Sequence, residues 1–152
     1  MKTTRASASR AKTSPLTRSQ TMARVKARNS KPELLVRRML TDMGYRYRLH
    51  RADLPGKPDI AFIGRRKLIF VHGCFWHGHD CRRGAREPKA NAAYWRRKIA
   101  ANRERDQRNC DALGAAGWAV LTVWECALGD RAAMEIRLKD FLSDAASVAG
   151  RE

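Results

Sequence analysis

The spacing of apolar and polar positions predicts a mixed α/β protein. A first helix is expected between Ser30 and Gly44, because a capping pattern at Ser30 and Glu33 precedes apolar residues at helical intervals. Strands are expected in YRYRLH, DIAFI and KLIFVH, then a long helix over residues 92–116, a strand in WAVLTVWEC and a last helix from Asp130 to about Ala146. This order predicts antiparallel strands before the long helix, a last strand that returns to the same sheet, and helices flanking that mixed sheet.

The charge of the chain indicates a polyanionic partner. Its 32 Lys and Arg residues against 15 Asp and Glu give a formal net charge of +17, which nucleic acid would neutralise. A basic surface that serves solubility is the alternative. No apolar run approaches the roughly 18 residues of a membrane span, so no membrane partner is expected. The four cysteines occur without a secretory segment, which predicts a cytoplasmic protein, associated with the nucleoid if the partner is DNA.

Residues 1–29 differ in composition from the rest of the chain. They contain no acidic residue and are rich in Ser, Thr, Lys and Arg, so we expect a largely disordered basic arm that follows DNA phosphates. An organellar transit peptide has a similar composition, but the basic surplus continues past residue 29 and favours the arm. Residues 30–147 are expected to form one domain, followed by a tail over residues 148–152.

The ends of the second and third strands bring together possible ligands for a cation. Asp59 follows Pro58 and His72 closes the next strand, so antiparallel pairing should place Asp59 opposite Val71 or His72, with Cβ atoms about 5 Å apart. A carboxylate, a backbone carbonyl and an imidazole at one point suit Mg²⁺ and phosphate chemistry. A structural turn aspartate is the alternative. His50 is interpreted as a surface histidine on a strand.

The segment VHGCFWHGHDC has the spacing of a zinc site. Its two cysteines flank two histidines, and a cysteine at the end of the last predicted strand would complete a Cys₃His set. Buried free thiols are the alternative, and Cys110 in the long helix fits that alternative. The spacing leaves open which histidine binds. The predicted ligands are Cys74, Cys81, Cys126 and either His77 or His79.

Two adjacent aromatic residues, Phe75 and Trp76, lie inside the same segment. Large aromatics in a short loop usually pack beneath it. Beside a basic surface they can instead insert between bases, which unstacks a step and kinks the duplex. The sequence leaves both roles open.

Four segments together resemble the very-short-patch-repair DNA mismatch endonucleases: LPGKPDIAF, IFVHGCFWHGHDC, YWRRKIAANRERD and GWAVLTVWECAL. The resemblance implies a restriction-endonuclease-like fold and Mg²⁺-dependent nicking of one DNA strand, 5′ of the thymine in a T·G mismatch left by deamination of 5-methylcytosine. We expect a monomer with a functional link to a DNA cytosine methyltransferase. The alternatives are a nuclease of this fold with another DNA substrate and a zinc-stabilised DNA-binding module without catalysis.

The resemblance also implies a role for individual positions. Asp59 corresponds to the metal-binding catalytic aspartate, and Glu33 to a further acid near the site, besides its place in the capping pattern. Val71 stands where the family often has threonine, and its backbone carbonyl can still bind the metal. The other implied residues are His72 and His77 as catalytic histidines, Cys74, His79, Cys81 and Cys126 as zinc ligands, Phe75 and Trp76 as an aromatic wedge, and Met22 as a residue inserted from the opposite groove.

Overall fold

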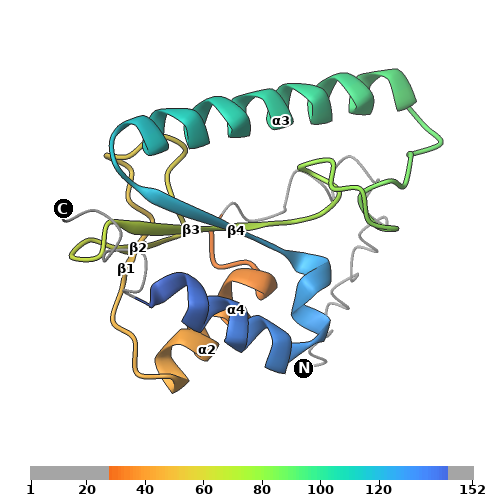
Figure 1. Cartoon of the computed structure of the whole chain (residues 1–152). Coiled ribbons are helices and arrows are strands. Elements are labelled where there is room, and N and C mark those ends of the chain that lie inside the picture. Colours follow the sequence, from red (N-terminus) through yellow and green to blue (C-terminus); the bar gives the residue numbers. More distant parts are fainter. Residues whose placement is uncertain (1–27, 144–152) are drawn as a thin grey trace, which may run out of the picture.

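The computed structural model describes residues 28–143, which form a four-stranded sheet between two layers of helices (Figure 1). Met22, most of the basic arm and the tail lie outside the described residues. The elements in chain order are α2 (Lys31–Asp42), β1 (Arg48–Leu49), β2 (Ile60–Phe62), β3 (Lys67–His72), α3 (Ala92–Ala115), β4 (Ala119–Trp124), the 3₁₀ helix η1 (Glu125–Gly129) and α4 (Arg131–Leu142).

The sheet has the strand order β1-β2-β3-β4. β1, β2 and β3 pair antiparallel, whereas β4 lies parallel to β3. A parallel neighbour requires a crossover connection, and the long helix α3 supplies it. The predicted mixed sheet and the return of the last strand are therefore confirmed.

The helices divide the core into two unequal parts. α2 and α4 cover one face of the sheet and α3 crosses the other (Figure 1). The larger core contains Val36, Leu40, Ile60, Ile69 and Leu138, among others. The core beneath α3 is much smaller, so this helix leaves room at one end for a cleft. Its buried members are Ala61, Leu68, Phe70 and Leu113.

Two predicted helix starts are confirmed by their capping bonds. The Glu33 N–H donates to Ser30 Oγ at 3.4 Å, and the Ala133 N–H donates to Asp130 Oδ1 at 3.1 Å. The Glu33 carboxylate reaches back to Asn29 N–H, one residue before the position of a standard capping box. α4 ends at Leu142, and the last residues of the predicted helix lie outside the described part of the chain.

The predicted strand YRYRLH is mostly wrong. Only Arg48–Leu49 pairs with β2, and His50 adopts a left-handed φ of 47° that ends the strand. The alternation of tyrosine and arginine in this segment has another cause, because Tyr45 and Tyr47 both pack edge-on against Phe62. The tyrosines therefore face the core without a partner strand.

The predicted hairpin register is also wrong, by one or two residues. Phe62 lies opposite Lys67, which places Asp59 opposite Phe70 instead of one or two residues further along β3. The reason is the turn over residues 63–66, which centres the hairpin earlier than predicted. In the part of the chain that the structure describes, no helix is long and apolar enough to cross a membrane.

Candidate active site and metal-binding clusters

A cleft of about 860 Å³ opens where β2 begins and β3 ends. Asp59, Val71 and His72 line it from the sheet. The Val71 N–H donates to Asp59 Oδ2 at 2.7 Å. Because the N–H and C=O of a strand residue point to the same neighbour, the Val71 carbonyl faces the same side as this carboxylate. Two oxygen donors at one strand end fit a hard cation such as Mg²⁺.

The environment of Asp59 favours a nearby cation. The pKa of Asp59 is raised to about 6, first by burial and then by the Glu33 carboxylate, while the Val71 hydrogen bond and His50 lower it. A buried carboxylate with a raised pKa gains from any positive charge that lies against its ionised form. The predicted metal-binding aspartate therefore lies where a cation would stabilise it.

His72 and His77 form a stacked pair beside Asp59 in the cleft. Their ring centroids are 3.7 Å apart and their planes differ by 3°. His72 is buried, and burial, followed by the charge of His77, lowers its pKa to about 4. His72 is therefore neutral at physiological pH and can bind a cation or accept a proton at a ring nitrogen. The structure brings together both predicted catalytic histidines.

Asp106 on α3 is the site residue that the sequence analysis missed. Its Oδ2 lies 2.5 Å from His77 Nδ1. The sequence contained a signal for this residue, namely its position on the face of α3 that packs against the sheet. That face is marked by residues at helical spacing from Asp106: Ile99, Asn102 and Leu113. An acid on the inward face of an amphipathic helix needs a partner, and here the partner is a histidine.

Glu33 is buried in the first turn of α2 and contacts His50. The His50 Nε2 lies 2.5 Å from Glu33 Oε1, and Glu33 Oε2 accepts the Asn29 N–H at 2.8 Å. The ligand atoms of Glu33, His50 and Asp59 all lie within 4.8 Å of one another. The interpretation of His50 as an isolated surface histidine is therefore wrong, because β1 ends beside Asp59 and turns the ring toward α2. Glu33 belongs to the helix cap and to the site at once.

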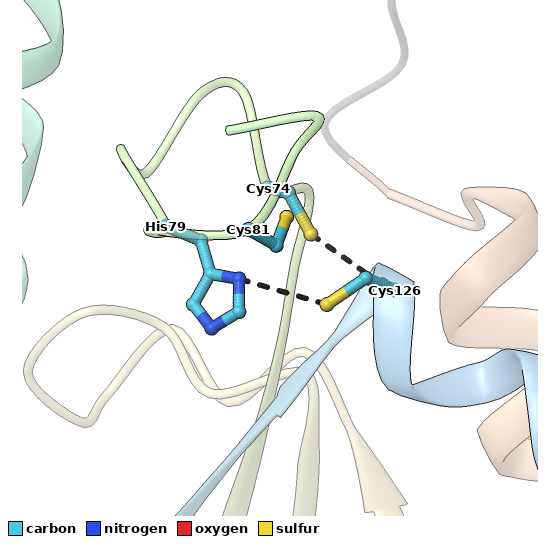
Figure 2. A group of neighbouring side chains, drawn as sticks. All are labelled: Cys74, His79, Cys81 and Cys126. Carbon is cyan, nitrogen blue, oxygen red and sulfur yellow. Dashed lines mark hydrogen bonds between the residues drawn. The ribbon is translucent and has the colours of Figure 1, made fainter. Parts of the chain in front are cut away.

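The second cluster is the predicted zinc site, drawn in Figure 2. The ligand atoms of Cys74, His79, Cys81 and Cys126 lie within 4.8 Å of one another. Cys126 belongs to η1 and not to the end of β4, and its Sγ lies 3.6 Å from His79 Nδ1. The Cys126 N–H donates to Cys74 Sγ at 3.4 Å. His77 bonds to Asp106 instead, so the geometry selects His79 as the histidine of this set.

The chemistry of the thiols fits a soft metal ion such as Zn²⁺. Burial raises the pKa of Cys74 to about 12, whereas a hydrogen bond with His79 lowers the pKa of Cys81 to about 6. A bound cation would favour the thiolate form of both. His79 also stacks on Trp124, with ring centroids 4.3 Å apart, so β4 supports the ring from one side.

Comparison with known proteins identifies the family of the chain. A family model described as DNA mismatch endonuclease Vsr matches residues 11–83. The type II nicking enzyme V.XorIIP of Xanthomonas oryzae pv. oryzae is 54% identical over 129 residues, which cover 85% of this chain and 94% of that protein. The DNA mismatch endonuclease Vsr of Escherichia coli K12 is 42% identical over 115 residues, covering 76% of this chain and 73% of that one.

The chain belongs to the Vsr family of DNA mismatch endonucleases. It is therefore an enzyme, and the alternative of a zinc-stabilised binding module without catalysis is excluded. A third relative, the type II nicking enzyme V.NmeAIP of Neisseria meningitidis serogroup A, is 42% identical over 121 residues, or 80% of this chain and 86% of that protein.

Cys110 of this Vsr-family chain lies apart from the cluster of Cys74, His79, Cys81 and Cys126. It is half-buried on α3 and lines the cleft near Asp106. Burial, and next the charge of Asp106, raises the pKa of its thiol. Cys110 is thus a free thiol outside the metal cluster, as predicted, although it is half-buried and not fully buried.

Phe75 and Trp76 are half-buried and pack against Trp95 of α3. Each ring centroid lies 5.7 Å from that of Trp95, and the two lie 5.5 Å from each other. Asn102 Nδ2 donates to the Trp76 carbonyl at 2.9 Å, which ties the loop to the helix. The pair therefore rests on a support and still retains exposed surface.

Proposed function

We propose that the chain nicks one strand of duplex DNA 5′ of the thymine in a T·G mismatch, in a Mg²⁺-dependent reaction. The observation that carries the proposal is the convergence of Asp59, the His72–His77 pair and Asp106 in one cleft of a Vsr-family endonuclease. Mismatches of this kind arise when 5-methylcytosine deaminates, which would link the enzyme to a DNA cytosine methyltransferase in the same cell.

Asp59 and the Val71 carbonyl are the residues that would hold Mg²⁺. When bound, the ion would neutralise charge on the reacting phosphate. Threonine is not required at position 71, because a backbone carbonyl is available from any residue. His72, neutral at physiological pH, adds a nitrogen acceptor beside Asp59.

His77 is the proposed base of the reaction. Asp106 holds its Nδ1, which leaves Nε2 to take a proton from the water that attacks phosphorus. The bond between phosphorus and the leaving sugar oxygen then breaks, and that oxygen takes a proton from water in the cleft. The carboxylate favours the protonated imidazole that forms, as in other Asp–His pairs.

Zinc in the second cluster would fix the loop that joins the catalytic cleft to that cluster. Cys74, His79 and Cys81 come from one short loop, and Cys126 comes from η1 (Figure 2). A Cys₃His zinc site would hold this loop against the sheet and keep His77, which belongs to the same loop, in place.

The surroundings of the cleft suit the DNA backbone. Arg28, Lys57 and Arg105 line it, in a chain with a net charge of +17. Lys and Arg contacts to phosphate fix the position of a duplex. Phe75 and Trp76 are proposed as a wedge that opens the base stack at the mismatch, and Met22 as its counterpart from the opposite groove.

A mapping experiment tests the proposal. A T·G duplex labelled separately on each strand is incubated with the enzyme and Mg²⁺, beside a matched C·G duplex. We expect a nick only in the thymine strand, immediately 5′ of the mismatched base, and none in the matched duplex. Equal cleavage of both duplexes would favour a nuclease of this family with another DNA substrate.

A further inference from the structure

His50 is the third member of a partly buried cluster with two carboxylates, and the proposed reaction does not yet use it. Its Nε2 lies 2.5 Å from Glu33 Oε1, and its backbone N–H donates to the Asp59 carbonyl at 3.1 Å. One residue is thus tied both to the acid on α2 and to the backbone of the acid at the start of β2. Nothing else in the described residues connects Glu33 and Asp59 in this way.

The backbone of His50 is held in a conformation that a histidine seldom adopts. Its φ of 47° lies in the left-handed region, which is unfavourable for a residue with a side chain. Such conformations persist where the surroundings fix them, often at functional sites. Here the left-handed turn ends β1 and directs the imidazole toward Glu33 instead of along the strand.

Two carboxylates within 4.8 Å of each other repel when both are ionised. Glu33 is 2% exposed, so water does little to screen its charge. Its Oε2 accepts the Asn29 N–H. Its Oε1 lies 2.5 Å from His50 Nε2 and forms a longer ion pair with Arg37, at 3.7 Å. The His50 ring therefore fixes the one carboxylate oxygen that the helix cap leaves unfixed.

We propose that His50 is a positioning residue of the metal site: it holds the Glu33 carboxylate beside Asp59, so that both acids face the same cation. The inference rests on the proposed Mg²⁺-dependent function. His50 acts through Glu33 and contacts neither substrate nor cation. A cation that binds Asp59 gains the second carboxylate at a fixed place, and without His50 it must order that carboxylate on binding.

Two substitutions separate the ring contact from the backbone. His50→Asn suits the left-handed conformation but is too short to reach Glu33. His50→Gln places an N–H donor near the position of Nε2 and should restore the contact. Arg37→Ala is the matched control, because it removes a cation that also lies near Glu33 Oε1, at 3.7 Å, but donates its hydrogen bond to Asn29 Oδ1.

The deciding measurement is the affinity of the full chain for Mn²⁺, determined by calorimetry. The protein is first saturated with Zn²⁺, and the Asp59→Ala variant provides the baseline. We expect His50→Asn to weaken Mn²⁺ binding about fivefold and to raise the Mg²⁺ concentration for half-maximal nicking by a similar factor, with unchanged KM for the duplex. His50→Gln and Arg37→Ala should both stay close to the wild type.

Three results would overturn the positioning role. The first is a wild-type Mn²⁺ affinity in His50→Asn. The second is tighter Mn²⁺ binding in that variant, which would make His50 a competitor of the cation. The third is an Mn²⁺ affinity of His50→Gln that stays low although this variant melts at the wild-type temperature. If the wild type binds Mn²⁺ through Asp59 with these variant effects but does not nick T·G duplexes, the proposed function fails and the role of His50 stands.

Discussion

His77 Nδ1 lies 2.5 Å from Asp106 Oδ2, although 29 positions of the chain separate the two residues. One belongs to the loop with the proposed zinc ligands and the other to the inward face of α3. Both side chains are about one-fifth exposed, so the pair lies at the wall of the cleft. A carboxylate in this place fixes the tautomer and the orientation of the imidazole.

Replacement of Asp106 should slow the chemical step. Asp106→Asn keeps the shape of the side chain but loses its charge, so the tautomer of His77 is no longer fixed and the imidazolium formed in the reaction has no carboxylate beside it. We expect kcat on a T·G duplex to fall by about 100-fold, the typical size of a general acid–base contribution, with little change in duplex affinity. Glu104→Gln is the matched control, because Glu104 is exposed on the same helix and should stay within about twofold of the wild type. Equal activity of the two variants would remove Asp106 from the mechanism.

Protein purified without chelators should contain about one zinc per chain. Cys81→Ser removes a ligand, so zinc content should fall and the melting temperature with it, because zinc binding contributes to folding. Cys110→Ser serves as the control, since this thiol lies outside the cluster and should leave the zinc content unchanged. Elemental analysis decides. Wild-type protein that is free of zinc and fully active would contradict the proposed site.

Trp76 should contribute more to binding of mismatched DNA than to folding. If the ring stacks between bases, Trp76→Ala should weaken affinity for a T·G duplex by about tenfold, the order expected for one base–aromatic stack. Affinity for matched duplex should change less, because an intact base stack resists insertion. A large drop in melting temperature with normal binding by the remaining folded protein would instead assign Trp76 to the support under the loop.

Ionised Asp59 should destabilise the metal-free protein. Its pKa in the folded state, about 6, lies above the ordinary value of 3.8, so the folded state binds the proton more tightly. Stability due to this group is therefore present at pH 4 and is lost as the pH rises through 6.

Asp59→Asn should accordingly stabilise the metal-free protein by about 1–2 kcal/mol at pH 8, a figure that allows for partial exposure, and by little at pH 4. The amide oxygen can still accept the Val71 N–H. Excess Mg²⁺ should shrink the difference at pH 8, since the cation stabilises only the carboxylate. Chemical denaturation at pH 4 and pH 8 measures the free energy of unfolding of both proteins. A gain in stability of Asp59→Asn that is the same at both pH values would argue against the raised pKa of Asp59.

The local signals in the sequence predicted most of the architecture. Ser30 and Asp130 start their helices as expected, because a capping side chain acts on neighbours only three residues away. The return of β4 to the same sheet was predicted from the order of the elements, and its parallel direction was seen only in the structure. The grouping of the four proposed zinc ligands was also predictable, because three of them lie within one short segment.

Two of the missed features depend on contacts between distant elements, and a third depends on a local turn. His50 was interpreted as a surface residue because its partner Glu33 lies 17 positions earlier, on another element. Asp106 was missed because only the packing of α3 brings it to His77. The hairpin register depended on the loop over residues 63–66, whose turn the sequence leaves ambiguous.

The nicking rate of Asp59→Ala on a T·G duplex in Mg²⁺ tests the central claim most directly. Asp59 is the only carboxylate hydrogen-bonded to the end of β3 in the described part of the chain, so its loss should abolish nicking while duplex binding by the folded variant survives. Wild-type nicking by Asp59→Ala would contradict the assignment of this cleft as the catalytic site.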